Sequence, residues 1–255
     1  MVRDDSHLYR RLELPGGGTP GDVLFVSLHE DNDGNLWLGT DGQGLQRVRP
    51  QTVRMYSTAQ GLVDHNTYAV LEDRAGAIWI GAWERGLSRV QDGRITNFTT
   101  ADGLVNGLVM ALAEDQAGRL WISARDITNG GLAILENDRI TRVTAPIVPD
   151  GAFVAAIHQG RDGAMWFGTS RGLVRYADGV ARTYTTADGL AGEDVRVIID
   201  GGPNRLWIGT YGGLSLLENG RFTSWTERDG LSSNSVGRST AIATTCCGSA
   251  RTTAG

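Results

Sequence analysis

The chain has 255 residues, of which 40% are apolar and 21% charged, and its formal net charge is −5. Its uninterrupted apolar runs, such as 152–157, are far shorter than the roughly 20 residues of a membrane-spanning helix. The charged residues 1–5 lack the apolar segment of a signal peptide, and an acidic chain without a basic cluster is not expected to bind nucleic acid. The 36 glycines indicate many tight turns and therefore many short strands.

The dominant feature is an internal repeat. Five tryptophans stand in one local frame, each between apolar residues and two positions before Gly or Ser, at spacings of 42, 42, 45 and 41. A second signal, Asp-Gly-Leu or Gln-Gly-Leu, keeps the same period. Two signals in register indicate a repeat architecture. The repeated tryptophans, which we expect to pack against neighbouring repeats as structural residues, are Trp37, Trp79, Trp121, Trp166 and Trp207.

Each repeat divides into four short strands separated by turns rich in Gly, Asp and Asn. In the second repeat we expect strands at 67–71, 77–82, 87–90 and 94–99, and no segment has a sustained helical period. Four strands in about 42 residues make one blade of a β-propeller. The sequence therefore predicts an all-β fold, a β-propeller spanning 1–235. Its five full repeats lie near 22–62, 63–104, 105–150, 151–190 and 191–231.

The two ends of the chain depart from this repeat. Residues 7–13 match the fourth strand of a blade, whereas 236–255 have no repeat character and contain both cysteines, Cys246 and Cys247. Residues 243–255, back-translated with GC-rich codons and read two bases further on, give Asp-Asp-Val-Leu-Trp-Ile-Gly-Thr-Asn-Asp-Gly-Gly. We interpret 236–255 as a frameshifted sixth blade, which sequencing of the locus would check. Open blade edges are expected to favour self-association.

The stretches 72–87 and 98–104 resemble the two-component regulator propeller repeat, and the resemblance extends from about residue 22 to residue 231. It implies a seven-bladed propeller in an intact parent, in the extracytoplasmic sensor part of histidine kinases or hybrid two-component systems. It also implies a periplasmic or extracytoplasmic location and a carbohydrate ligand. The kinase domain would belong to a longer parent. Blade three lacks the Asp-Gly-Leu ending, and blade four has Gln159-Gly160 where the repeat has Glu-Asp.

Three segments match motifs of other protein classes without the context that those motifs need. Residues 168–172 fit G-x-S-x-G, but a nucleophile elbow requires a following helix. Residues 16–21 fit G-x-G-x-x-G, but a strand is expected next instead of the helix that would bind a pyrophosphate. Residues 31–35 begin like an EF-hand loop but place Gly at the fourth position, so a β-turn is expected.

The four histidines, His7, His29, His65 and His158, share no spacing. His29 and His158 occupy equivalent places near the end of a first strand, with no carboxylate partner expected in register. A propeller lyase similar to the streptogramin lyases is the enzymatic alternative, but it needs paired His and Glu on one face, and the sequence does not assemble them. We therefore predict no catalytic residue, no metal site and no cofactor.

A ligand site is expected where the blades differ, because residues common to all blades hold the fold together. In a propeller the loops before each first strand and after each second strand share one face. Trp83 is the strongest candidate, since the repeat does not require it, whereas Trp225 replaces a strand-four aromatic and is expected in the core. Aromatic, Arg and amide groups suit an oligosaccharide or another small polar ligand. A protein-interaction scaffold or a receptor-dimerisation module remain alternatives. The predicted ligand-binding residues are His65, Asn66, Trp83, Glu84, Arg125, Asn129, Arg171 and Tyr211, with Asp64, Ser170, Glu193 and Asp194 beside them.

Overall fold

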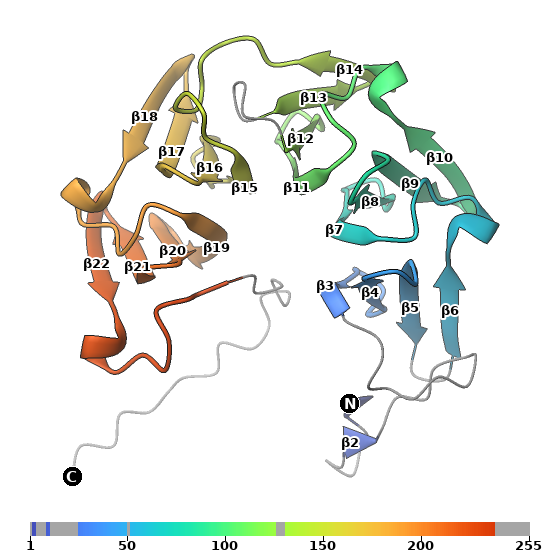
Figure 1. The fold of residues 1–255 in the computed structure, drawn as a ribbon, viewed down its shortest axis with the longest axis horizontal. Helices are drawn as coiled ribbons and strands as arrows, with labels where there is room; N and C mark the ends of the chain where they lie inside the picture. The colour runs from blue at the N-terminus through green and yellow to red at the C-terminus, as the bar shows by residue number, and fades with distance from the viewer. Residues whose placement is uncertain (1, 4–8, 11–24, 50–51, 126–130, 238–255) are drawn as a thin grey trace.

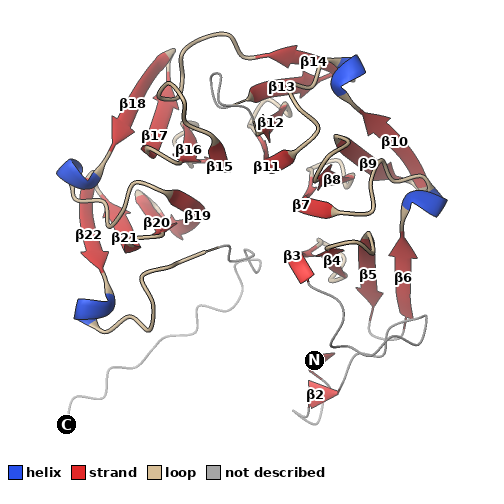
Figure 2. Cartoon of the chain, in the orientation of Figure 1, coloured by secondary structure: helices blue, strands red, loops and turns tan. Residues whose placement is uncertain are grey.

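The computed structural model of the chain describes residues 2–3, 9–10, 25–49, 52–125 and 131–237. Five four-stranded antiparallel sheets lie side by side along an arc around a common centre (Figure 1). Within the described residues, helix is confined to single 3-10 turns at the outer edge of the blades (Figure 2). The predicted β-propeller of four-stranded blades is confirmed. No helix in this part of the chain is long and apolar enough to cross a bilayer.

Each sheet is one blade, and its strands follow one another in sequence from the centre of the arc to its outside (Figure 1). Blade one contains β3 (Phe25–Glu30), β4 (Leu36–Thr40), β5 (Leu45–Arg49) and β6 (Thr52–Tyr56). Blade two contains β7 (Thr67–Glu72), β8 (Ile78–Ala82), β9 (Leu87–Gln91) and β10 (Arg94–Phe98). Blade three contains β11 (Val109–Glu114), β12 (Leu120–Ala124), β13 (Leu132–Glu136) and β14 (Arg139–Arg142).

The last two blades repeat this order. Blade four contains β15 (Val154–Gln159), β16 (Met165–Thr169), β17 (Gly172–Ala177) and β18 (Val180–Tyr184), and blade five contains β19 (Val195–Gly202), β20 (Arg205–Thr210), β21 (Gly213–Glu218) and β22 (Arg221–Trp225). In blade two the expected strands agree with the observed ones to within one residue at each end. A short ladder pairs β1 (Val2–Arg3) with β2 (Tyr9–Arg10). The rest of 7–13, and residues 238–255 of the proposed frameshifted blade 236–255, lie outside the described residues.

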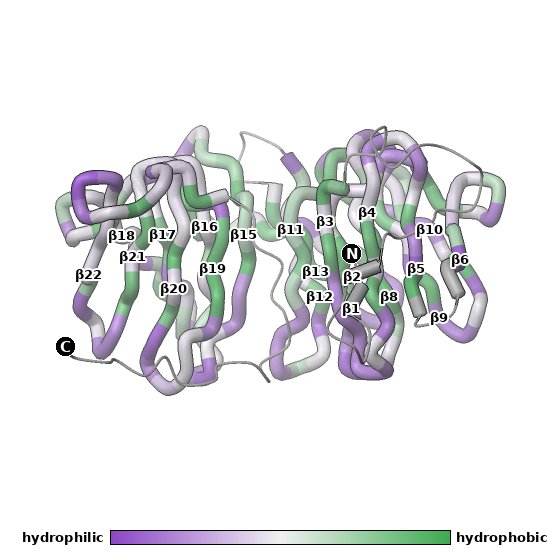
Figure 3. The backbone as a smooth tube through the Cα atoms, turned by 90° about the horizontal axis from the view of Figure 1, so that it is seen from below, coloured by the Kyte–Doolittle hydropathy of each residue, from purple (hydrophilic) through white to green (hydrophobic). Residues whose placement is uncertain are grey.

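The strands give the ring two faces, seen edge-on in Figure 3. We call one face the channel mouth: it holds the loops that precede each first strand and those that follow each second strand. We call the other face the turn rim: it holds the turns between first and second strands and between third and fourth strands. The expectation that the candidate loops share one face is confirmed by this strand order.

The repeated tryptophans form the contacts between blades, as expected. Trp79 is 3% exposed and packs with Leu120 and Ile122 of the next blade. Trp207 is only half-buried, because no following blade covers it within the described residues. Trp225, expected in the core, is half-buried for the same reason and packs on Trp207, with 5.8 Å between ring centroids. Burial of the repeated tryptophan therefore depends on the next blade.

The glycine two positions after the repeated tryptophan lies at a contact between neighbouring blades. Gly81 lies inside β8, and a Cβ there would come within 2.7 Å of the Val109 side chain at the start of the next blade. Gly168 and Gly209 stand in the same way against Val195 and Val236. Glycine is required because neighbouring blades approach closely at this point. Blade three has Ser123 instead, and its Oγ donates a hydrogen bond to the Val154 carbonyl at 2.6 Å.

The Asp-Gly-Leu or Gln-Gly-Leu signal folds as a capped 3-10 turn. Thr99 is the N-cap of the second of these turns: its Oγ1 accepts from Ala101 N, and Asp102 Oδ2 accepts from Thr99 N at 2.8 Å. Gly103 then adopts φ 109°, a left-handed value that favours glycine. Leu104 follows and is fully buried. The four turns are η1 (Thr58–Gln60), η2 (Thr100–Asp102), η3 (Thr186–Asp188) and η4 (Glu227–Asp229).

Candidate functional site

One backbone hydrogen bond, repeated in blades two to five, builds the channel mouth. In blade two, Trp83 N donates to the Asn66 carbonyl at 3.0 Å and so joins the loop after the second strand to the residue before the first. The bond fixes where each side chain leaves the backbone, while the side chain itself changes from blade to blade. The equivalent bonds run from Arg125 to Leu108, from Ser170 to Phe153 and from Tyr211 to Asp194.

Trp83 is an exposed aromatic side chain of the mouth. It is 43% exposed, and its ring lies 5.4 Å from that of Tyr68, tilted by 55°. Tyr68 belongs to the innermost strand β7 and is half-buried. Together the two rings give an apolar wall that solvent can reach.

An apolar cluster continues this wall across the innermost strands. Leu108, Met110 and Ala155 are buried together, and Tyr68 and Phe153 pack against them. These residues come from blades two, three and four. The wall therefore follows the curve of the ring and is not confined to one blade.

Two arginines extend the wall to blade five. The Arg125 guanidinium carbon lies 5.5 Å from the centre of the Phe153 ring. Arg196 lies 5.2 Å from the same ring and 4.4 Å from the ring of Tyr211, which is 53% exposed. Such cation–π contacts hold the guanidinium groups in place. A continuous line of contacts thus joins Trp83 to Tyr211.

Several buried polar atoms beside this wall make no hydrogen bond in the described structure. They are Asn66 Oδ1, Asp194 Oδ1 and Arg196 Nε, although Asp194 Oδ2 accepts from Arg196 at 2.6 Å. Buried polar groups are normally paired, so each unpaired one calls for an explanation. A bound ligand or ordered water would provide the missing partners.

The other predicted site residues have different roles. Asp64 is buried and structural: its carboxylate accepts from Asn66 N at 3.1 Å and Glu84 N at 3.3 Å. His65 is exposed and lies 3.5 Å from Asp64 Oδ1. The side chains of Glu84 and Arg171 are also exposed at the mouth. Asn129 lies outside the described residues.

Among the aromatic and charged residues of the wall, three were not predicted from the sequence. Tyr68 and Arg196 each follow the first residue of an innermost strand, the register position that Met110 and Ala155 hold in the other blades. Phe153 precedes β15 and is equivalent to Asn66. Side chains along a strand alternate in direction. Comparing this strand position across the repeats would therefore have revealed which side chains point toward the channel.

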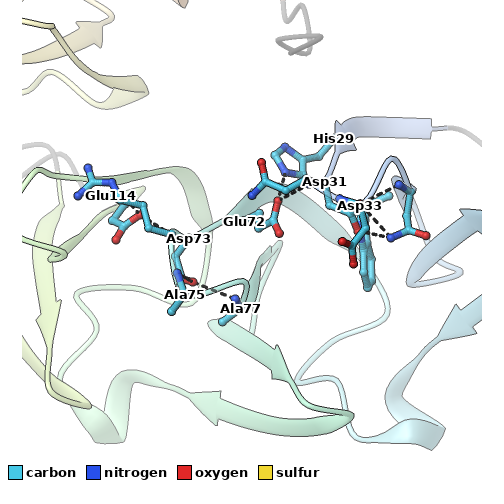
Figure 4. A network of polar contacts seen from close by, with 12 residues as sticks. His29, Asp31, Asp33, Glu72, Asp73, Ala75, Ala77 and Glu114 are labelled. Atoms are coloured by element: carbon cyan, nitrogen blue, oxygen red, sulfur yellow. Dashed lines mark hydrogen bonds and ion pairs between the residues drawn. The ribbon is translucent and has the colours of Figure 1, made fainter. Parts of the chain in front are cut away.

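The turn rim, by contrast, is built from carboxylates that recur. Asp73 Oδ1 accepts from Ala75 N and Ala77 N at 3.0 and 2.9 Å, and its Oδ2 accepts from Trp79 Nε1 at 2.7 Å. Glu114 of the next blade accepts from Arg74 N at 2.8 Å. Figure 4 shows the turn around Asp73 with Glu114 and the counterpart of this turn around Asp31 and Glu72. We call the Asp–Trp hydrogen bond with its turn the Asp clamp.

The Asp clamp explains the segment that begins like an EF-hand. All acceptor atoms of Asp31 that the structure describes point to internal donors: Asp33 N, Asn35 and Trp37 Nε1. Burial opposes ionisation of Asp31, but these hydrogen bonds outweigh it and lower the pKa of its carboxyl. The segment is a structural turn. No group of three or more His, Cys, Asp or Glu that could hold a metal occurs in the described residues.

Two histidines lie at the turn-rim ends of their strands, away from the mouth. Burial lowers the pKa of both His29 and His158. The expectation that His29 has no carboxylate partner in register is wrong, because Glu72 of the next blade lies 4.0 Å from its Nε2. The strand register within one blade could not reveal this neighbour.

Segment 168–172, which fits G-x-S-x-G, spans the hairpin between β16 and β17, with no helix following, as expected.

Five four-stranded blades, four of them with a tryptophan buried against the next blade, define the class of protein as a β-propeller built from sequence repeats. The family model described as two component regulator propeller matches residues 18–42 and 103–126. These two stretches of the chain are similar to the two component regulator propeller repeat. A search of curated proteins finds no match.

Solved structures share this fold at low sequence identity. The extracellular domain assigned to the hybrid two component system BT3049 from B. thetaiotaomicron has a TM-score of 0.69 and 21% identity, and the match covers 79% of this chain and 28% of that one. A virginiamycin B lyase from Staphylococcus aureus has a TM-score of 0.64 and 15% identity, covering 81% and 71%. PorZ of Porphyromonas gingivalis, a component of the type-IX secretion system, has a TM-score of 0.64 and 16% identity, covering 84% and 35%.

Proposed function

We propose that this propeller is a ligand-sensing domain of a two-component system and that the channel mouth binds an oligosaccharide or another small polar ligand with a ring-shaped body. The proposal places the domain outside the cytoplasmic membrane, in a longer parent that carries the signalling output. The observation that carries it is the wall from Trp83 to Tyr211, with unpaired polar atoms beside it.

The chemistry of the wall fits such a ligand. Binding sites for small molecules are mostly apolar or aromatic, with a few polar groups that fix orientation. Trp83 and Tyr211 offer exposed rings, while Asn66 Oδ1 offers an acceptor and Arg196 Nε a donor. The two component regulator propeller match and the extracellular domain of BT3049 support the sensing role.

A non-catalytic role fits the arrangement of histidines better than the lyase alternative, even though virginiamycin B lyase shares the fold. His65 is at the mouth, but its described partner is Asp64 and not a glutamate. His29 and His158 lie at the other end of their strands. The described mouth therefore brings no His–Glu pair together.

A thermal-shift screen against oligosaccharides tests the proposal. A ligand that binds only the folded state raises the melting temperature by mass action, by an amount that grows with concentration. We expect at least one soluble oligosaccharide to raise it in the wild type and to have a weaker effect on Trp83→Ala. A chain that responds to no small molecule, but binds a protein partner through the mouth, would be a scaffold instead.

A further inference from the structure

Arg125 is a cation of the channel mouth that no carboxylate neutralises in the described part of the chain. It is exposed, and it forms no ion pair with any described residue. Its position is nevertheless defined, because its N donates to the Leu108 carbonyl at 2.8 Å and its guanidinium carbon lies 5.5 Å from the centre of the Phe153 ring. The guanidinium is therefore held in place while its hydrogen-bond donors remain accessible to a ligand.

Arg196 contacts the same ring but has its own counter-charge. Its guanidinium carbon lies 5.2 Å from the centre of the Phe153 ring, so two like charges share one aromatic side chain. Asp194 Oδ2 lies 2.6 Å from Arg196 and neutralises it. Glu193, beside Asp194, instead accepts a hydrogen bond at 3.5 Å from the outer turn η3. The uncompensated positive charge at Phe153 therefore belongs to Arg125.

Arg125 also adjoins the aromatic part of the wall. Leu108, whose carbonyl accepts from Arg125, belongs to the buried apolar cluster, and Tyr68 packs against that cluster. The Tyr68 ring in turn contacts Trp83. A ligand whose ring lies on Trp83 and which extends along the wall toward Phe153 therefore reaches Arg125.

A ligand that covers Arg125 removes water from a charged group. Withdrawing a charge from water without a partner is strongly unfavourable. A carboxylate compensates the guanidinium through charge-assisted and often bidentate hydrogen bonds, which the hydroxyl groups of a neutral sugar cannot match. Arg125 therefore favours an acidic ligand over a neutral one of the same shape.

The charges of the mouth also set the direction of such a ligand. Glu84, which follows Trp83, is exposed and repels a carboxylate at the blade-two end of the wall. Arg125, in blade three, attracts it. The favoured arrangement places the sugar ring on Trp83 and the acidic group toward Arg125.

We infer that the channel mouth recognises an acidic sugar, a uronic acid residue within an oligosaccharide, whose carboxylate binds the Arg125 guanidinium. The inference rests on the function proposed for the mouth and narrows the class of its ligand. In this arrangement Trp83 contributes affinity for a sugar ring, and Arg125 determines specificity for the acid.

Uronic acid oligosaccharides and their carboxyl-reduced forms test the charge requirement, because reduction removes the carboxylate and keeps the rings and linkages. Isothermal titration calorimetry at constant ionic strength compares both forms of galacturonate, glucuronate and mannuronate oligomers on the full chain. We expect at least one acid form to bind at least tenfold more tightly than its reduced form. Reduced forms that bind as tightly as the acids, or no binding of either form, would overturn the inference. The proposed function fails separately, if the thermal-shift screen finds no stabilising small molecule of any kind.

Arg125→Gln assigns the preference to this side chain. It should weaken binding of the acid form at least tenfold and leave the affinity for the reduced form largely unchanged, whereas Arg125→Lys, which keeps the charge, should lose less. Arg139→Gln is the matched control, because Arg139 is an exposed arginine at the turn-rim end of the same blade. It should leave both affinities unchanged, and circular dichroism reports on the folding of each variant. Equal losses in Arg125→Gln and Arg139→Gln, or a full preference for the acid form in folded Arg125→Gln, would overturn the role of Arg125.

Discussion

The turn rim and the channel mouth are opposite ends of the same strands, yet they carry different kinds of side chain. At the turn rim, Asp31, Asp73 and Asp115 make the same bond to the repeated tryptophan in successive blades. At the mouth, one backbone bond repeated in blades two to five carries a different side chain in each of them, among them Trp83 and Tyr211. Repeated residues hold blades together, whereas residues that differ are available for recognition.

Blade two contains both kinds of tryptophan four residues apart. Trp79 is 3% exposed, and its indole is bonded to Asp73. Trp83 is 43% exposed and touches one other ring, that of Tyr68. Substitution of Trp79 is therefore expected to lower the stability of the fold, whereas substitution of Trp83 is expected to weaken ligand binding.

The largest effect is expected at the blade interface. Trp79→Ala should lower the free energy of unfolding by about 3–5 kcal/mol, because it leaves a cavity between two blades. Trp207→Ala should cost less, since Trp207 is half-buried with no blade beyond it in the described residues. Urea denaturation followed by circular dichroism measures both. Equal losses would show that the next blade does not determine the contribution of the tryptophan.

The next largest loss of unfolding free energy is expected at the Asp clamp. Asp115→Ala removes the acceptor of Trp121 Nε1 and of two backbone N–H groups, so it should cost about 2–3 kcal/mol of unfolding free energy. Asp33→Ala is the matched control, because Asp33 lies exposed in the equivalent turn of blade one. The same loss in both variants would contradict a special role for the clamp.

Acid should destabilise the fold in two steps. Burial lowers the pKa of His29 and His158 below the unfolded value of about 6.5, so their contribution is present above that pH and is lost as the pH falls through the folded pKa. For Asp115, burial opposes ionisation but hydrogen bonds from Trp121 and Arg119 lower the pKa, so its contribution is lost below about pH 4.

Denaturation at pH 7, 5 and 3.5 checks this order. His158→Gln should flatten the decline between pH 7 and 5, and Asp115→Asn should flatten it below pH 4. A decline that neither variant alters would show that other groups control the acid sensitivity.

The smallest stability effect is expected at the mouth. Trp83→Ala should change the free energy of unfolding by no more than about 1 kcal/mol, since the side chain is largely exposed. The same urea denaturation measures it. A loss as large as that of Trp79→Ala would make Trp83 a packing residue and remove the anchor of the binding face.

The repeat made most of the fold predictable. The period of the tryptophans placed five blades, because each tryptophan must be buried against a neighbour of the same kind. The 3-10 turns were missed, although Thr99 and Asp102 form the capping box. A three-residue turn contains too little sequence to show a helical period.

The site was predictable only in part. Trp83 and Tyr211 stand out in the sequence because the repeat does not require them. Tyr68, Phe153 and Arg196 did not, because they became neighbours only when the curved ring brought separate blades together.

The central claim is that Trp83 binds a ligand and does not hold the fold. The most direct test is isothermal titration calorimetry with the oligosaccharide that stabilises the wild type most, on the wild type, Trp83→Ala and Trp83→Phe. We predict that Trp83→Ala binds at least tenfold more weakly, a difference of about 1.4 kcal/mol, and that Trp83→Phe, which keeps a ring, loses less. Equal dissociation constants for all three folded proteins would contradict the assignment of the channel mouth as the binding site.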